Sequence, residues 1–287
     1  MKYYFVTTKH LKDSVWFRDE DDFKVCMNAV ALIACLTSVT VLAFVLMSNH
    51  VHFLIRCLPM DVDYFINELK RHYSRYVRNK YGIKESLRRN SVHIVEIDSE
   101  GESLEKTIAY IQMNPVAAGI CLYPNQYRWG TGNCFFSEVP PTGDPFGGLN
   151  RLRQKRLVHS KKQVPDNYLV CKDNYILPES YVDVESVEKI YRTPKRLSYF
   201  QNTSSKIKQK LDMEETVSPH FQDQVILSAL GDLMRALFRK DTLTALNEEE
   251  KGELLKQIQY RFSSNIHQMA RVVGLEYDEV VRLLEQV

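Results

Sequence analysis

The stretch VLMSNHVHFLIR, residues 45–56, decides the expected fold. It is apolar and β-prone except for His50 and His52, which lie two residues apart. Successive side chains of a strand point to opposite faces, so the two imidazoles share one face while Val51 and Phe53 take the other. Neutral imidazoles at this spacing can bind one metal ion from the same side, with the apolar residues anchoring the strand on helices behind it. Two polar aromatics on the open face of a half-buried sheet are the alternative, and a short motif alone does not decide between them.

The composition indicates a globular protein, since 287 residues with 44% hydrophobic content are enough for one large domain or two ordinary ones. The net charge of +2 is too small to indicate a polyanionic partner, so binding of nucleic acid has to be inferred from local clusters of charge. The six cysteines form no C-x-x-C pair and no regular framework, which favours free thiols in a reducing cytoplasm.

One apolar stretch, residues 25–47, is long enough to span a membrane. Polar and β-branched residues at 37–40 interrupt it, so we expect a helix over residues 21–36, a buried strand over 39–47, and no membrane association. Residues 3–7 predict a first strand rather than a secretory signal, which would need a longer apolar core.

A basic helix is expected after the histidine stretch, from about residue 61 to residue 81, where Gly82 stops it. Arg71, Arg75 and Arg78 recur at helical spacing on one of its faces. Such a stripe is usually a solvated face. Acidic neighbours are nearly absent here, however, so contact with phosphates is an equally good interpretation.

Another helix is expected to open near residue 103, after a strand over residues 92–97. Tyr110 and Asn114 lie off its apolar stripe and one turn apart on a common face. Pro115 follows at once, so the helix is expected to end there. A tyrosine half buried at a helix edge is the alternative interpretation of Tyr110, and it involves no chemistry.

Taken in order, the paired histidines, the basic helix, the run YIQMNPVAAGI at residues 110–120 and the YRW at residues 127–129 resemble the REP-associated tyrosine transposases. These are relatives of the single-strand insertion-sequence transposases within the HUH nuclease superfamily. The similarity covers residues 1–132, and the motifs are specific in combination although each alone is not. The resemblance implies an α+β fold: a ferredoxin-like antiparallel sheet with helices forms the HUH nuclease domain, and a mainly helical C-terminal region follows.

The same resemblance implies a transposase that cleaves single-stranded DNA and rejoins it through a 5′-phosphotyrosine intermediate, on DNA hairpin sites. Residue by residue, it implies His50 and His52 as metal ligands, Tyr110 as the nucleophile and Asn114 as the third ligand. The expected cofactor is a divalent metal, Mg²⁺ or Mn²⁺. Because His and Asn ligands are softer than the oxygen cage that Mg²⁺ prefers, Mn²⁺ should substitute readily.

The chemistry of this set has a physical reason apart from the family. A tyrosine hydroxyl, whose ordinary pKa is about 10, is a poor nucleophile at neutral pH, so the phosphate that it attacks must be made more reactive. A divalent metal bound to that phosphate neutralises charge and holds the phosphorus in line for attack. No ATP-binding P-loop is expected, because the glycine-containing segment 143–148 lacks the G-K-[ST] ending.

Three units are expected along the chain. They are a nuclease domain over residues 1–139, a basic linker with a hairpin and helices over residues 140–215, and a helical domain over residues 216–287. The linker composition is concentrated in residues 140–148 and 204–215, which are rich in Pro and Gly or in polar residues.

A basic run follows the first linker stretch, with no acid among its charges: Arg151, Arg153, Lys155, Arg156, Lys161 and Lys162. A basic run of this kind is more often a solvated linker than a segment that recognises a specific DNA sequence. Beside a DNA nuclease it predicts a phosphate clamp, so its first four members join Arg71, Arg75 and Arg78 as candidate DNA-binding residues.

The end of the chain predicts a helix-turn-helix, with Gly274 at the turn and residues 277–285 in the recognition position. Acidic residues on that second helix, Asp278 and Glu279 among them, are unusual on a surface that faces DNA. A packing or dimerisation module is therefore the alternative.

Two other functions fit the same residues. A catalytically silent DNA-binding regulator of the same fold is the rival from another class. An HUH replication initiator is the closer rival, and the lack of an obvious helicase segment makes it less favoured. DNA, single-stranded or hairpin, is the expected partner in each case. The chain is expected to act alone or as a homodimer, because single-strand transposases share active sites across a dimer while the REP-associated ones need not.

Overall fold

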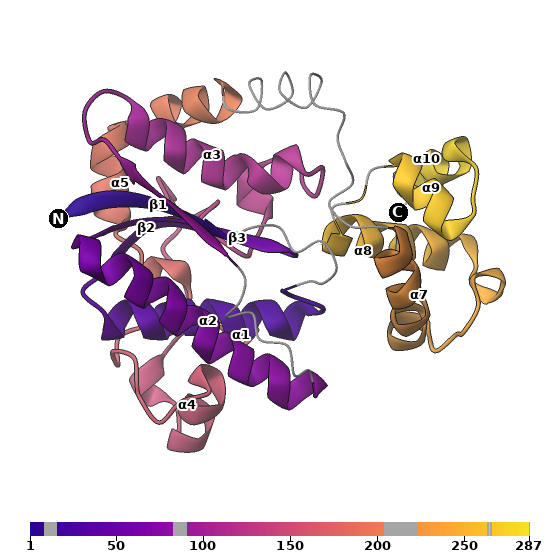
Figure 1. Ribbon diagram of the computed structural model, residues 1–287, viewed down its shortest axis with the longest axis horizontal. Helices are drawn as coiled ribbons and strands as arrows, with labels where there is room; N and C mark the ends of the chain where they lie inside the picture. Colours follow the sequence, from indigo (N-terminus) through magenta and orange to yellow (C-terminus); the bar gives the residue numbers. More distant parts are fainter. Residues whose placement is uncertain (9–15, 83–90, 204–222, 263, 265, 287) are drawn as a thin grey trace.

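The structure, a computed structural model, describes residues 1–8, 16–82, 91–203, 223–262, 264 and 266–286. Its first elements follow the order β1 (Lys2–Thr8), α1 (Glu20–Leu36), β2 (Thr40–Met47), β3 (His50–Cys57), α2 (Pro59–Tyr81) and β4 (Val92–Ile97). These strands pair antiparallel, and their order across the sheet is β2-β3-β1-β4 (Figure 1). This is the ferredoxin-like arrangement, so the predicted α+β fold class is confirmed.

The two faces of the sheet differ because side chains alternate along each strand. Phe53 of β3 pairs with Val6 of β1 and Phe44 of β2, and these buried side chains lie on the face that α1 and α2 cover (Figure 1). The Phe53 ring meets the ring of Phe65 in α2 edge-on, with centroids 5.5 Å apart. His52, one residue earlier, therefore points to the opposite face.

Helix α1 begins at an acidic N-terminus, where the Asp19 carboxylate accepts a hydrogen bond from the backbone N–H of Asp22 at 3.0 Å. It is buried on most sides because α2, α4 (Arg151–Val158) and the sheet surround it. The chain leaves α1 after Leu36 and starts β2 at Thr40, as predicted from the polar interruption. None of the described helices combines the length with the apolarity that crossing a bilayer requires.

Helix α2 ends where the sequence predicts. Gly82 takes a left-handed φ of 66°, and its N–H donates to the carbonyl of Arg78 at 2.9 Å. Phe65, Leu69 and Tyr73 recur every fourth residue and are fully buried against the sheet side of the domain. Arg71, Arg75 and Arg78 are exposed, whereas Lys70 is only 3% exposed.

Helix α3 (Ser103–Ala117) packs on β2 and β3 from the other face of the sheet (Figure 1). The predicted end of this helix at Pro115 is wrong, since the helix continues through Pro115 to Ala117. The ring removes one N–H donor, but the Pro115 carbonyl still accepts from the N–H of Ile120 at 2.9 Å. The missing hydrogen bond falls in the last turn of the helix. Its cost is therefore small enough for packing on the sheet to hold the helix in place.

The outer edge of β2 is closed by the YRW segment, which follows the short 3₁₀ turn η2 (Pro124–Gln126). The N–H of Leu46 donates to the carbonyl of Trp129 at 2.9 Å, and the N–H of Thr131 donates to the carbonyl of Phe44 at 3.0 Å. Between them lies Gly130, where an added Cβ would sit 2.6 Å from the Phe44 carbonyl oxygen. A side chain at this position would push the segment off the sheet.

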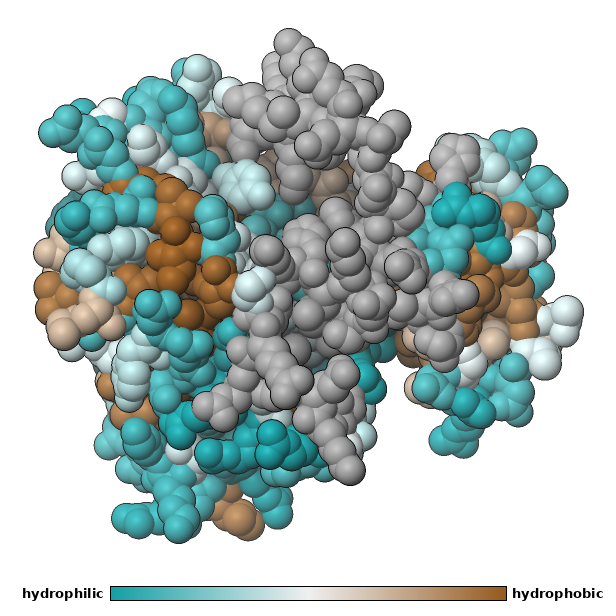
Figure 2. Space-filling model, in the orientation of Figure 1, coloured by the Kyte–Doolittle hydropathy of each residue, from teal (hydrophilic) through white to brown (hydrophobic). Residues whose placement is uncertain are grey.

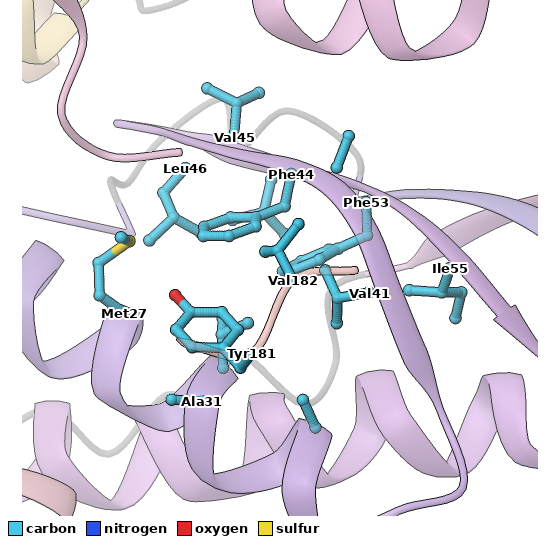
Figure 3. Close-up of a cluster of buried hydrophobic side chains, with 14 of the residues drawn as sticks. Met27, Ala31, Val41, Phe44, Val45, Leu46, Phe53, Ile55, Tyr181 and Val182 are labelled. Atoms are coloured by element: carbon cyan, nitrogen blue, oxygen red, sulfur yellow. The ribbon is translucent and has the colours of Figure 1, made fainter. Parts of the chain in front are cut away.

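The segment after this edge holds β5 (Asp144–Pro145), η3 (Phe146–Gly148), α4, β6 (Leu169–Val170), η4 (Pro178–Ser180), α5 (Val184–Tyr191) and further helical residues at 194–203. Tyr181 and Val182 insert between α1 and the sheet, as Figure 3 shows, and the Tyr181 ring stacks on Phe44 with centroids 6.0 Å apart.

Residues 140–148 do not behave as the linker expected from their composition. Phe146 in the middle of them is fully buried, because the pairing of β5 with β6 holds this segment against the main hydrophobic core. That core extends from Tyr4 to Phe200. The boundary at residue 139 stays a prediction, and the second linker stretch, 204–215, lies outside the described residues.

The C-terminal helices have a hydrophobic core of their own. They are α7 (Asp223–Phe238), η5 (Leu243–Ala245), α8 (Glu248–Phe262), α9 (Ile266–Val273) and α10 (Tyr277–Gln286). The turn between α9 and α10 forms at Gly274 with φ 71°, where the sequence places it. Helix α8 contacts the first core, because the Trp129 indole N–H donates to the Tyr260 hydroxyl and Arg261 donates to the Arg18 carbonyl. That α10 recognises DNA stays a prediction.

Candidate active site

The two histidines lie side by side on the face of β3 that α3 covers. Their ring centroids are 4.7 Å apart, the planes cross at 81°, and each residue is only 4% exposed. The rigid strand and its pairing with β1 and β2 set this spacing. The geometry predicted from the H-x-H pattern, two imidazoles on one face, is therefore present.

Asn49, immediately before the pair, orients the first imidazole. It is fully buried, and its side-chain oxygen Oδ1 lies 2.7 Å from Nδ1 of His50. Because an amide oxygen only accepts, the His50 Nδ1–H donates, and the lone pair is then on Nε2. Sequence reasoning assigned no role to Asn49, although an Asn next to a candidate ligand at a hairpin turn is a usable signal.

Tyr110 reaches the histidines from α3. Its ring lies edge-on to His52 with centroids 5.6 Å apart, and Phe5 of β1 stacks on His52 at 5.5 Å and meets Tyr110 at 5.9 Å. Tyr110 is 37% exposed while His50 and His52 are nearly buried, so the phenol forms the solvent side of the cluster. Three elements, β1, β3 and α3, thus bring an imidazole pair and a phenol together.

Asn114 lies one helical turn after Tyr110 and is 3% exposed. Its side-chain Nδ2 donates to the backbone carbonyl of Tyr110 at 2.9 Å, which fixes the amide plane against the helix. An amide held this way presents an oxygen donor in a constant direction. The residue predicted as third ligand is thus in the buried part of α3, not at an exposed helix end.

Long-range hydrogen bonds hold α3 against the sheet. Gln112 is buried, donates through Nε2 to the carbonyl of Thr131 at 2.9 Å, and accepts from Gln201 at 2.8 Å. The Tyr191 hydroxyl donates to the carbonyl of Glu105 at 2.6 Å. Sequence reasoning missed these groups because their partners lie far away along the chain.

The donor set at the cluster fits a divalent ion held by few protein ligands. Two imidazole nitrogens and one amide oxygen leave coordination positions for water and for substrate oxygens, as Mg²⁺ and Mn²⁺ require. Among the described residues no group of three or more His, Cys, Asp or Glu side chains could hold a metal.

A third histidine shares this face. Thr7 of β1 pairs with His52 of β3 on one side and with His93 of β4 on the other, so the three side chains form one row across the sheet. His93 is exposed, unlike His52. Sequence reasoning did not single it out, although the alternation in residues 92–97 would have placed it on one face of a strand.

The candidate DNA-binding residues lie elsewhere. Arg71, Arg75 and Arg78 are exposed on α2, and the basic run Arg151, Arg153, Lys155 and Arg156 belongs to α4. Both helices are on the side of the sheet away from α3 (Figure 1). The structure thus brings His50, His52, Tyr110 and Asn114 into one region and leaves the arginines and lysines outside it.

A comparison with protein families matches the part of the chain that carries this cluster. Residues 1–114 match the model of the family described as "Transposase IS200 like". One solved structure, described as the REP-associated tyrosine transposase bound to a REP hairpin, aligns with 45% of this chain and 76% of its own at 16% identity, with a TM-score of 0.35. The chain matches none of the curated proteins. The family match contains all four clustered residues and stops before α4 and the C-terminal helices.

Proposed function

Residues 1–114 match the family described as "Transposase IS200 like". From this match we propose that the chain is a single-tyrosine transposase of the HUH superfamily, that is, a metal-dependent single-strand DNA endonuclease and strand transferase. The observation that carries the proposal is that His50 and His52 of β3 lie close to Tyr110 of α3. The ring centroids are 4.7 Å apart for His50 and His52, and 5.6 Å apart for His52 and Tyr110. The meeting of these three side chains supports the proposal over the two interpretations that involve no chemistry, polar aromatics on an open face and a tyrosine at a helix edge.

His50, His52 and the Asn114 amide oxygen would hold the divalent metal, with Mn²⁺ or Mg²⁺ as the candidates. When bound, the metal supplies charge neutralisation at the scissile phosphate and in-line orientation of it. The contact of Asn49 with Nδ1 of His50 would fix the tautomer and the rotation of that imidazole, so that Nε2 carries the lone pair for the metal.

Tyr110 would supply the nucleophile. Its hydroxyl oxygen attacks the phosphorus, the bond from phosphorus to the 3′ oxygen breaks, and a 5′-phosphotyrosine and a free 3′ hydroxyl result. The phenol gives up one proton and the departing oxygen takes one up. A second 3′ hydroxyl then attacks the phosphotyrosine, rejoins the DNA and regenerates the phenol, so no ATP is consumed.

DNA hairpins with a flanking single strand are the substrate that we propose, and Arg71, Arg75, Arg78, Arg151, Arg153, Lys155 and Arg156 are proposed to contact its phosphates. The cytoplasm is the proposed place of action. These assignments rest on the resemblance of the motifs. Light scattering with and without DNA would decide whether the protein acts as a single chain or as a homodimer.

Covalent trapping tests the proposal. The protein is incubated with 5′- and 3′-labelled single strands and Mn²⁺, and adducts are resolved under denaturing conditions. Wild type and Tyr123→Phe, a matched change at a tyrosine 63% exposed, should form the adduct, whereas Tyr110→Phe should not. Failure of wild type to form any adduct on hairpin-bearing strands would favour the catalytically silent regulator.

A further inference from the structure

A pocket lined by cations lies between α4 and the loop that follows it. Its volume is about 230 Å³, and its basic lining residues are Arg151, Lys155, Lys161 and Lys162. The remaining lining is Phe146, Gln154, Val158, Ser160 and Gln163, so no acidic side chain takes part. The family match ends before this segment, and the pocket has no place in the chemistry described above.

The floor of the pocket is built from fixed polar groups. Gln154 is 7% exposed; its Nε2 donates to the carbonyl of Phe146 at 3.0 Å, and its Oε1 accepts from Gln163 at 3.3 Å. The N–H of Lys162 donates to the hydroxyl of Ser160 at 3.0 Å. These bonds hold the loop against α4, so the pocket is formed before any ligand arrives.

The positive charge of the pocket is not balanced by any ion pair among the described residues. In the described part of the chain, carboxylates pair with other cations, such as Arg71, Lys80 and Arg196, and none pairs with the four pocket cations. Four adjacent cations without counter-charge repel one another. An anion that enters the pocket removes this repulsion and gains charge-assisted hydrogen bonds.

The size of the pocket indicates a compact anion. Ligand pockets for drug-sized molecules occupy roughly 300–1,000 Å³, so the volume of about 230 Å³ is too small for a nucleotide and fits a phosphate group with water. Arginine matches two phosphate oxygens at once, and lysines act as point charges around it. The chemistry of the lining is thus that of a phosphodiester site.

The positive surface extends from the pocket onto α2. His72 is hydrogen-bonded to the backbone of Val158, a pocket residue, and Arg71 and Arg75 lie on either side of His72. Figure 2 shows mainly hydrophilic side chains over the lower part of the molecule, where α4 and this stretch of α2 lie. Several phosphates in succession could follow such a surface, which favours a polymer over a free phosphate ion.

We propose that the α4 pocket, with the adjoining arginines of α2, binds the backbone phosphates of a DNA segment other than the one that Tyr110 attacks. The proposal rests on the proposed function for the identity of the polymer. Tyr110 approaches from α3, while α4 packs on α1 beyond the opposite face of the sheet. The sheet therefore separates the two sites, and one short strand cannot occupy both.

Salt-dependent binding tests the pocket. The quadruple variant Arg151→Gln, Lys155→Gln, Lys161→Gln, Lys162→Gln is compared with wild type on a long strand that carries a hairpin and both flanks, and on a short strand that spans only the scissile phosphate. Each phosphate contact that is lost should lower the slope of log affinity against log salt by about 0.7 to 0.9. We expect the slope on the long strand to fall by two or more such steps, and affinity for it to fall at least about tenfold at low salt, with a smaller loss on the short strand.

The matched control is Lys172→Gln, Lys189→Gln, Lys195→Gln, Arg235→Gln, which removes the same charge from exposed positions outside the surface. Any of four results would overturn the proposal. The control variant could lose as much affinity as the pocket variant, the pocket variant could lose equal affinity for both strands, its salt slope could stay unchanged, or the protein could bind RNA of the same sequence more tightly than DNA. Thermal unfolding confirms that both quadruple variants are folded. Tyr110→Phe is measured in parallel: loss of its adduct tests the nuclease proposal, while the salt slope tests only the pocket, so the two can fail separately.

Discussion

The two sides of the sheet differ in how they use their polar residues. On the α3 side, two imidazoles and a phenol from distant parts of the sequence lie with ring centroids 4.7 and 5.6 Å apart, and the buried Asn114 amide follows one helical turn after the phenol. On the opposite side, the cations at the contact of α4 with α2, such as Arg75, Arg151 and Lys155, are exposed, and no ion pair is seen for them among the described residues. The first side has fixed geometry and almost no formal charge, whereas the second has charge and loose geometry.

This difference matches what each task requires. Metal ligation and in-line attack fail when a group moves by about an ångström, so those groups must be locked by packing and hydrogen bonds. Phosphate attraction acts over roughly 8 Å at physiological salt and tolerates flexible side chains. Changes on the α3 side should therefore act on chemistry, and changes on the α4 side should act on binding.

The largest effect is expected from His50→Ala and His52→Ala. Each should lower adduct formation at least about 100-fold, because a bound metal supplies several kcal/mol of transition-state stabilisation and each ~1.4 kcal/mol is a factor of ten. Binding of long DNA without metal should stay at the wild-type level. His93→Ala, on the same face but exposed, is the matched control; an equal loss in that variant would contradict the assignment of the pair.

Asn49→Ala should have the next largest effect, a loss of roughly 10- to 100-fold in cleavage or metal affinity, the range typical of a group that orients a ligand. Asn49→Asp keeps an oxygen that accepts from His50 Nδ1 and should retain more activity than Asn49→Ala. The measurement is the Mn²⁺ concentration that gives half-maximal adduct formation. If both variants shift this Mn²⁺ concentration equally, the hydrogen bond of 2.7 Å between Asn49 and His50 does not orient the imidazole.

Gln112→Leu tests the anchoring of α3. The change leaves the buried carbonyl of Thr131 and the amide of Gln201 without their partner, which should cost about 1–3 kcal/mol of unfolding free energy. Denaturant unfolding measures this. Asn202→Leu, at an exposed amide, serves as the control. A variant as stable as wild type would show that packing alone holds the helix.

The smallest effect is a dependence of stability on pH at the contact of α2 with α4. Burial lowers the pKa of both His72 and His159 below the ordinary value of 6.5. The unfolded chain then takes up protons first, so this stability is present above pH 6.5 and is lost as pH falls toward the folded-state pKa values. Tm should be lower at mildly acidic pH than at neutral pH.

His159→Asn is the comparison, because Asn tolerates the left-handed φ of 45° at this position. Its Tm should depend less on pH than that of wild type over the same range. Asp19, near the same contact, does not titrate in this pH range. Burial acts to raise its pKa, but hydrogen bonds from Lys80 and from the backbone of Asp22 hold the pKa below the usual value. An unchanged pH dependence in the variant would assign the effect to other groups.

Sequence patterns predicted most of the first 120 residues because the relevant forces there are local. Alternation placed His50 and His52 on one face, and helical periodicity placed Tyr110 and Asn114 one turn apart. The predicted helix end at Pro115 was wrong because the rule considers the missing N–H but not the sheet beneath the helix. Residues 140–148 were read as a linker for a similar reason, since composition does not reveal that Phe146 is buried.

The sequence by itself determined the strands and helices of the N-terminal half, the family that they resemble, and the residue types able to do the chemistry. Only the tertiary structure decided that the imidazoles meet Tyr110 under α3, that Gln112 ties this helix to Thr131, and that the basic run of α4 lies across the sheet from both. The physical reason is the range of the interactions. Propensity and periodicity act over a few residues, whereas the tertiary structure depends on contacts between distant segments, 131 positions apart for Trp129 with Tyr260 and 243 for Arg18 with Arg261.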